Sequence, residues 1–179
     1  MKRFLLLLCV IALSISSLNA QKSILNKDTA TLIFVRHAEK VDDGSKNPPL
    51  SKKGDERALR IKNFLKNTYK KVDAVFSTDY KRTEFTAQPT AKEFNLVIQK
   101  YDPRAPNVFI KSLLKDYQGK VVLIVGHSNT TPFLVNVLLD EDRFAQLDES
   151  AYDEIFIVKA SDIGKAKVSI KSSAEGVKN

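Results

Sequence analysis

Short apolar runs alternate along this chain with longer segments in which apolar residues recur every three or four positions. The short runs are rich in β-branched and aromatic residues, as buried strands are. They predict strands at residues 32–35, 73–77, 96–101, 121–125, 154–158 and 166–170. The run at 121–125, Val-Val-Leu-Ile-Val, is the most hydrophobic of them and predicts the central strand.

The segments between these runs have the features of helices and loops. Ser51, for example, is a good helix N-cap and is followed by apolar residues at helical spacing. The pattern predicts helices at 51–69, from 79 past a kink or break at Pro89, at 107–117 and at 131–139, with irregular loops at 41–49, 102–106 and 140–153. Strands that alternate with helices are typical of an α/β fold with a mostly parallel sheet.

The N-terminal twenty residues have a different pattern. Lys2 and Arg3 precede an almost wholly apolar stretch at 4–15, and small and polar residues follow up to Ala20. This order is typical of a secretory signal peptide. We therefore predict a signal peptide at 1–20, cleaved after Ala20, and a periplasmic or secreted protein. A retained N-terminal anchor stays open as the alternative, although the apolar stretch is shorter than the about 20 residues that span a bilayer.

The remaining residues, 21–179, suit a single domain with its own core, and the polar tail from about residue 171 is expected to fray. An apolar fraction of 43% and a charged fraction of 28% are ordinary for a soluble globular protein. The only cysteine, Cys9, lies in the predicted signal peptide. The mature chain is therefore expected to depend on its core, without disulfide bonds.

The formal net charge of +8 comes largely from lysines that are spread along the chain. No basic block is interleaved with aromatic residues, as a binder of single-stranded nucleic acid would need. We therefore expect an anionic small molecule as the partner and no nucleic acid. We also expect no membrane contact once the signal peptide is removed.

Ionisable side chains gather where the predicted strands end. Arg36 and His37 follow the first strand, His127 follows the central strand, and Arg82 lies a few residues after the second strand. Since α/β sheets bind ligands at the carboxyl ends of their strands, these side chains are expected to meet. Arginine pairs phosphate oxygens bidentately and neutral histidine can attack phosphorus, so the set indicates phosphoryl chemistry. No Cys/His cluster occurs and arginines repel cations, so we predict no metal and no cofactor.

Four segments, in this order, resemble the motifs of the histidine phosphatase superfamily, also called the phosphoglycerate mutase-like superfamily. Residues 36–39, Arg-His-Ala-Glu, are similar to its Arg-His-Gly signature, and residues 49–54, Pro-Leu-Ser-Lys-Lys-Gly, are similar to its Pro-Leu-Ser/Thr-x-x-Gly turn. Residues 77–87 resemble the segment of its second arginine, and residues 126–128, Gly-His-Ser, resemble that of its second histidine. The resemblance spans about residues 30–140 and is greatest to small members without a cap, the phosphohistidine-phosphatase-like proteins.

This resemblance implies a three-layer α/β/α sandwich with a mostly parallel central sheet, and it implies a role for each matching residue. His37 would be the phosphorylated nucleophile. Arg36, Arg82 and His127 would bind and stabilise the transferring phosphoryl group. The glycine of the signature is replaced by Ala38, which is a mild change.

The general acid is the part of the site that the resemblance does not supply. Many relatives carry a glutamate on an inserted cap, but only about 20 residues separate the third predicted strand from the fourth. Glu39, two residues after His37, is the first candidate for the acid that protonates the leaving group. Asp102, at the end of another strand, is the second candidate.

The sequence thus predicts an exported histidine-type phosphatase. It would hydrolyse phosphomonoesters or related phosphoryl compounds of small molecules through a phosphohistidine on His37. Two alternatives stay open, namely a phosphotransferase of the phosphoglycerate mutase type and a phosphate-binding module without catalysis. The identity of the substrate and the oligomeric state stay open as well.

Overall fold

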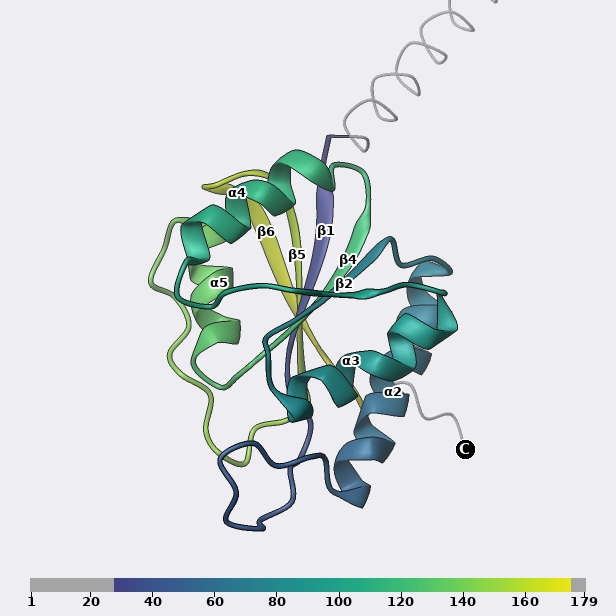
Figure 1. The fold of residues 1–179 in the computed structure, drawn as a ribbon. Coiled ribbons are helices and arrows are strands. Elements are labelled where there is room, and N and C mark those ends of the chain that lie inside the picture. Colours follow the sequence, from purple (N-terminus) through teal and green to yellow (C-terminus); the bar gives the residue numbers. More distant parts are fainter. Residues whose placement is uncertain (1–27, 175–179) are drawn as a thin grey trace, which may run out of the picture.

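A computed structural model describes residues 28–174 of the chain (Figure 1). Within this range six strands form one sheet and four helices cover it. In chain order the elements are β1 (Ala30–Arg36), α2 (Lys52–Tyr69), β2 (Ala74–Ser77), α3 (Lys81–Glu93), β3 (Ile98–Lys100), α4 (Pro106–Asp116), β4 (Val121–Gly126), α5 (Thr130–Leu139), β5 (Glu154–Asp162) and β6 (Lys165–Ser172). As predicted, residues 41–49 and 140–153 form loops without a helix or strand.

The sheet has the strand order β3-β2-β4-β1-β5-β6. Strands β3, β2, β4 and β1 are parallel to one another, whereas β5 joins β1, and β6 joins β5, by antiparallel pairing. The most hydrophobic of the predicted strands, β4, lies between β2 and β1 in the interior of the sheet. The predictions of a mostly parallel sheet and of its central strand are therefore confirmed.

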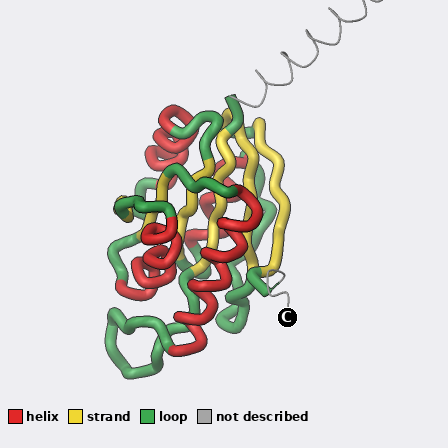
Figure 2. Tube along the Cα trace, turned by 90° about the vertical axis from the view of Figure 1, so that its right-hand side faces the viewer, coloured by secondary structure: helices red, strands yellow, loops and turns green. Residues whose placement is uncertain are grey.

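The helices form two layers, one on each face of the sheet, to the left and to the right of the strands in Figure 1. Figure 2 looks onto the strands from the side of α2 and α3. Side chains alternate along a strand, so β1 turns Leu32 and Phe34 to one face and Ile33 and Val35 to the other. Helices α4 and α5 pack on the first face, and α2 and α3 pack on the second. Burial on both faces explains why these strands are continuous apolar runs. The three-layer α/β/α sandwich is confirmed.

The third strand is shorter than predicted, because its first residues close the preceding helix. Asn95 takes a left-handed backbone φ of 52°, and the Leu96 N–H donates to the carbonyl of Ala91 at 2.8 Å. A hydrogen bond of this kind ends a helix and satisfies one of its last carbonyls. β3 therefore begins only at Ile98, and Val97 is left 84% exposed.

Three further predictions concern Pro89 and the ends of the chain. Helix α3 continues through Pro89 as one helix, so of the predicted kink or break the break does not occur. Strand β6 includes Lys171 and Ser172, so regular structure extends into the segment that was predicted to fray. The predicted signal peptide lies outside the described residues. Between residues 28 and 174, no helix has the length and apolar character needed to span a bilayer.

The carboxyl ends of β1, β2 and β4 meet at one edge of the sheet. Arg36 lies opposite Gly126 in the β1–β4 register, and Ser77 lies opposite Val125 in the β2–β4 register. The His37 N–H donates to the carbonyl of Gly126 at 2.9 Å. The residues that leave these strands therefore start side by side, at the edge where α/β sheets bind their ligands.

Helix α2 begins directly against the segment that leaves β1. The Ser51 N–H donates to the Glu39 carbonyl at 2.9 Å, and the Ser51 hydroxyl accepts from the Gly54 N–H at 3.2 Å as an N-cap. Gly54 is so close to Glu39 that a Cβ at this position would collide with the Glu39 carbonyl. The segment Pro-Leu-Ser-Lys-Lys-Gly therefore sets the distance between a strand end and a helix, and it contributes no reacting group.

Candidate active site

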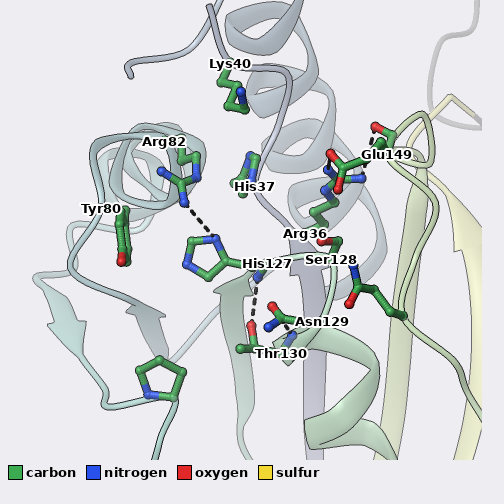
Figure 3. A pocket seen from close by; sticks show the side chains of 12 residues that line it. Arg36, His37, Lys40, Tyr80, Arg82, His127, Ser128, Asn129, Thr130 and Glu149 are labelled. Atoms are coloured by element: carbon green, nitrogen blue, oxygen red, sulfur yellow. Dashed lines mark hydrogen bonds and ion pairs between the residues drawn. The ribbon is translucent and has the colours of Figure 1, made fainter. Parts of the chain in front are cut away.

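A cleft of about 460 Å³ lies at this edge of the sheet (Figure 3). It is lined by Arg36, His37, Arg82 and His127, so the fold brings together the four residues on which the sequence argument rests. The remaining lining residues come from the loops and helix starts around it and are Lys40, Tyr80, Pro103, Ser128, Asn129, Thr130, Gln146 and Glu149. Between β3 and β4 the chain forms only α4 and its connections, without an inserted cap.

His37 is held in one orientation and one tautomer. The residue is 4% exposed, and its Nδ1 lies 2.8 Å from the backbone carbonyl of Ala38. A carbonyl only accepts hydrogen bonds, so Nδ1 carries the ring proton and Nε2 keeps a free lone pair. Burial, together with the nearby charges of Arg82 and Arg36, lowers the pKa of His37 to about 3. At neutral pH the ring is therefore uncharged, which is the nucleophilic form of histidine.

His127 belongs to a chain of hydrogen bonds that fixes its tautomer. Arg82 Nη2 can only donate and lies 3.4 Å from His127 Nδ1, so Nδ1 is the acceptor. The other nitrogen, Nε2, then carries the proton and donates to the Thr78 hydroxyl at 2.9 Å. Thr83 donates its own hydroxyl proton to a backbone carbonyl and accepts from Thr78 at 3.0 Å. Two threonines, one after β2 and one in α3, therefore orient this histidine.

The two histidine rings lie close together among positive charges. Their centroids are 5.4 Å apart, in an edge-to-face arrangement. Burial, with the charges of Arg82 and Arg36, lowers the pKa of His127 to about 4. In Figure 3, His37 lies between the guanidinium groups of Arg82 and Arg36. The cleft thus has a positive charge while both of its imidazoles remain neutral.

Arg36 is almost fully buried and is held by the loop before β5. Its Nη1 donates to the carbonyls of Asp148 and Ala151 at 2.7 and 3.1 Å, and its Nη2 donates to the Glu149 carboxylate at 3.0 Å. The guanidinium carbon lies 4.2 Å from the centre of the Tyr152 ring. Its Nε is buried and has no hydrogen-bond partner among residues 28–174. This donor is therefore available to a bound anion.

Arg82 reaches the cleft from the first turn of α3. Its guanidinium carbon lies 4.4 Å from the centre of the Tyr80 ring, which also packs edge-on against His127 at 5.0 Å. Like the Nε of Arg36, the Nε of Arg82 is buried without a partner in the described part of the chain. Two buried donors that lack acceptors at one cleft fit an anion such as a phosphoryl group. No group of three His, Cys, Asp or Glu side chains that could hold a metal ion occurs in the same range.

Glu39 does not line the cleft, so the structure contradicts its predicted role as the general acid. Its carboxylate accepts two hydrogen bonds from Arg57, at 2.6 and 2.8 Å, and lies 3.4 Å from Lys53. Arg57 also pairs with Asp153 and donates to the Ser173 hydroxyl at 3.0 Å. Burial acts to raise the pKa of Glu39, but the hydrogen bonds from Arg57 prevail and hold that pKa below its ordinary value. Glu39 is therefore an ionised structural partner of Arg57 and cannot donate a proton to a leaving group.

Asp102, the second candidate for the acid, is also outside the lining of the cleft. Its carboxylate accepts from the Arg104 side chain at 2.9 and 3.0 Å. These hydrogen bonds lower the pKa of Asp102. Because Asp102 is paired within its own turn and does not line the cleft, it does not serve as the acid here.

Thr78, Tyr80, Glu149 and Tyr152 contact the histidines and arginines of the site but are not among the residues that the sequence indicates. Thr78 and Tyr80 lie inside the segment that resembles the second-arginine motif, but nothing in their spacing indicated contact with His127. Glu149 and Tyr152 lie in the acidic loop at 140–153. A backbone hydrogen bond to the turn after β4 brings this loop beside the cleft. The excess of acidic residues in the loop was the one signal in the sequence that could have directed attention to it.

Known structures share this fold although their sequences differ widely. The structure of the protein histidine phosphatase SixA complexed with tungstate is 17% identical, has a TM-score of 0.65, and the match covers 81% of this chain and 98% of that chain. A protein described as a candidate phosphohistidine phosphatase SixA, from Agrobacterium tumefaciens, is 17% identical with a TM-score of 0.62 over 80% of this chain and 98% of that chain. A mycobacterial glucosyl-3-phosphoglycerate phosphatase is 13% identical and has a TM-score of 0.60. The match covers 80% of this chain and 98% of that chain. At these identities the likeness establishes the fold.

The sequence itself provides a separate match. The family model described as histidine phosphatase superfamily (branch 1) matches residues 32–105, which include His37 and Arg82. No curated protein matches the chain in sequence.

Proposed function

We propose that this chain is a histidine-type phosphatase of the histidine phosphatase superfamily, whose family model matches residues 32–105, and that it hydrolyses phosphomonoesters or related phosphoryl compounds of small molecules through a phosphohistidine on His37. The state of His37 carries this proposal. Its ring is neutral, its Nδ1 is bound to the Ala38 carbonyl, and its Nε2 lone pair is free. Two guanidinium groups line the same cleft.

In the first step the Nε2 lone pair of His37 attacks phosphorus. The bond from phosphorus to the leaving oxygen breaks, and its electron pair goes to that oxygen. Arg36 and Arg82 stabilise the phosphoryl group through their charge and their buried Nε donors. His127 accepts from Arg82 and so holds that guanidinium in place.

In the second step a water molecule attacks the phosphohistidine. The bond between phosphorus and Nε2 breaks, the electron pair returns to Nε2, and inorganic phosphate is released. The Ala38 carbonyl keeps the proton on Nδ1 throughout, so the ring regains its nucleophilic form without rearrangement.

A His37→Ala variant tests the mechanism. Phosphate release from an aryl phosphate should fall by more than about 10³-fold, because the covalent route is removed. Radiolabelled substrate should leave an acid-labile, alkali-stable phosphoryl group on the wild-type protein and none on the variant. Lys115→Ala, on an exposed face of α4, serves as the control and should behave as wild type. Undiminished phosphate release by His37→Ala would contradict the proposal.

The same assays separate the two alternatives that the sequence left open. A phosphoglycerate mutase would depend on a bisphosphoglycerate primer and pass the phosphoryl group to an acceptor other than water. A module without catalysis would bind inorganic phosphate and never carry a trapped phosphoryl group.

We further propose that the enzyme acts outside the cytoplasm. The proposal rests on the basic start, the apolar stretch at 4–15 and the small residues up to Ala20, together with a cysteine content limited to Cys9. Expression of the full chain should yield a periplasmic or secreted protein whose mass corresponds to cleavage before Gln21. A Leu7→Arg variant, with a charge in the apolar stretch, should stay unprocessed. Uncleaved wild-type protein in the membrane fraction would contradict cleavage and favour an anchor.

A further inference from the structure

Glu149 is the one carboxylate in the lining of the cleft, as far as residues 28–174 are concerned. Its carboxylate lies 3.0 Å from Nη2 of Arg36, yet its own side chain is 77% exposed. Water screens an ion pair whose carboxylate is this exposed, and such a pair is weak. Glu149 can therefore leave Arg36 for another contact at little cost.

The backbone that carries Glu149 is fixed although its side chain is free. The Leu147 N–H donates to the carbonyl of Ser128 at 2.9 Å, next to His127. On the other side of Glu149, Arg36 holds the carbonyl of Ala151 at 3.1 Å. The exposed carboxylate is thus attached to a fixed backbone at the rim of the cleft, beside Arg36 (Figure 3).

A phosphoryl group that enters the cleft competes with Glu149 for Arg36. The phosphoryl dianion carries more charge than a carboxylate and meets two arginines instead of one. The displaced carboxylate stays at the rim of the cleft that His37, Arg36 and Arg82 line. From there a carboxyl group can exchange a proton with an oxygen atom of the bound substrate.

We propose that Glu149 is the general acid and base of this phosphatase, an inference that rests on the proposed function. In the first step the carboxyl proton of Glu149 passes to the leaving oxygen as the bond from phosphorus to that oxygen breaks. In the second step the carboxylate takes a proton from the attacking water, while the electron pair of the P–N bond returns to Nε2 of His37.

This assignment narrows the substrate class. An alkoxide is a poor leaving group and needs a proton as it departs, whereas a nitrophenolate departs without one. A proton donor at the rim therefore fits phosphate esters of aliphatic alcohols.

The test compares two substrates that differ in their need for the proton, glycerol phosphate and 4-nitrophenyl phosphate. Glu149→Gln should lower kcat/KM for glycerol phosphate by about 10²–10⁴-fold, the usual contribution of general acid catalysis. With 4-nitrophenyl phosphate, the rate of the first step in the same variant should stay within about threefold of the wild-type rate, because that step needs no acid. Glu141→Gln removes a carboxylate from the same loop but outside the cleft lining and should leave both rates unchanged. Because Glu149 is exposed, unaltered thermal unfolding of Glu149→Gln should confirm that the variant is folded.

Three results would overturn the assignment. These are equal losses on both substrates, unchanged rates on both, and a wild-type enzyme that cleaves the aryl ester but no alkyl ester. Single-turnover phosphorylation of His37 by the aryl ester isolates the first step, so a slow second step in the variant does not obscure the comparison. A wild-type protein without any aryl phosphate hydrolysis would instead contradict the proposed function, so the two failures are distinguishable.

Discussion

Two arginine–carboxylate pairs flank the strand end that carries His37, and their surroundings differ sharply. In the Arg57–Glu39 pair both side chains are buried, at 5% and 12% exposure, and two hydrogen bonds join them. In the Arg36–Glu149 pair the arginine is just as buried, at 2%, but the glutamate is 77% exposed and makes one contact of 3.0 Å. The first pair is largely shielded from solvent, and the second faces the cleft.

This difference separates a structural pair from one that can exchange partners. Breaking the Arg57–Glu39 pair would leave the buried charge of Arg57 with only Asp153 and Ser173 as partners, so the pair stays formed and holds α2 to the segment after β1. Breaking the Arg36–Glu149 pair costs little when an anion replaces the carboxylate. Closeness along the sequence is therefore a poor guide to the general acid. Glu149 contacts Arg36, the neighbour of the nucleophile, although 113 positions separate the two residues.

The largest expected difference between the two pairs is in their contribution to the free energy of unfolding. Glu39→Gln should lower the free energy of unfolding by about 3 kcal/mol, because Arg57 keeps its charge in a buried site with fewer partners. Urea denaturation followed by circular dichroism measures this loss, and Glu149→Gln is the matched control with an expected change below about 0.5 kcal/mol. Equal losses in the two variants would show that the two pairs do not differ as their burial implies.

The stabilisation by Glu39 should also depend on pH. Its pKa in the folded chain is lowered from the ordinary value of 4.5, so the unfolded chain binds a proton more readily. Such a group stabilises the fold fully above the unfolded pKa, and the stabilisation is lost as pH falls through the folded pKa. The difference in unfolding free energy between wild type and Glu39→Gln should stay constant down to about pH 5.5 and shrink below about pH 4.5.

Urea denaturation of both proteins at a series of pH values measures this difference. Protonation of His37 and His127 on unfolding affects both proteins alike and therefore cancels. A difference that grows on acidification would contradict the ion-pair interpretation of Glu39.

The smallest expected effect concerns the support of Arg36 by Tyr152. Tyr152→Leu removes the ring beside the guanidinium, a contact worth about 1 kcal/mol, and should weaken competitive inhibition by inorganic phosphate about fivefold. Tyr152→Phe keeps the ring and should match wild type. Equal weakening in both variants would assign the effect to the hydroxyl group instead.

The sheet and the four residues that line its edge could be predicted from the sequence because their signals are local. Apolar runs such as 32–35 and 121–125 specify strands that are buried on both faces. The polar residues that follow those runs then lie at the carboxyl edge in any parallel arrangement of the strands. This rule places His37 and His127 at the same edge without any information on the contact between them.

The surroundings of these residues could not be predicted, because they depend on contacts between distant parts of the chain. Arg36 meets the carbonyls of Asp148 and Ala151 only because the loop before β5 returns to the turn after β4. Glu39 was misassigned because its partner, Arg57, reaches it only when α2 has packed on the sheet. The start of β3 was misplaced for a similar reason, since the closing turn of α3 uses residues with a strand-like composition.

Gly54 contains no functional group, yet its position limits what substitutions the chain can tolerate. A side chain there would displace the Glu39 carbonyl and the backbone that precedes it. That backbone includes the Ala38 carbonyl, which decides which nitrogen of His37 holds the proton. A mutational scan for activity should therefore find this glycine as intolerant as the nucleophile, and a tolerance map would mark as catalytic a residue that never meets the substrate.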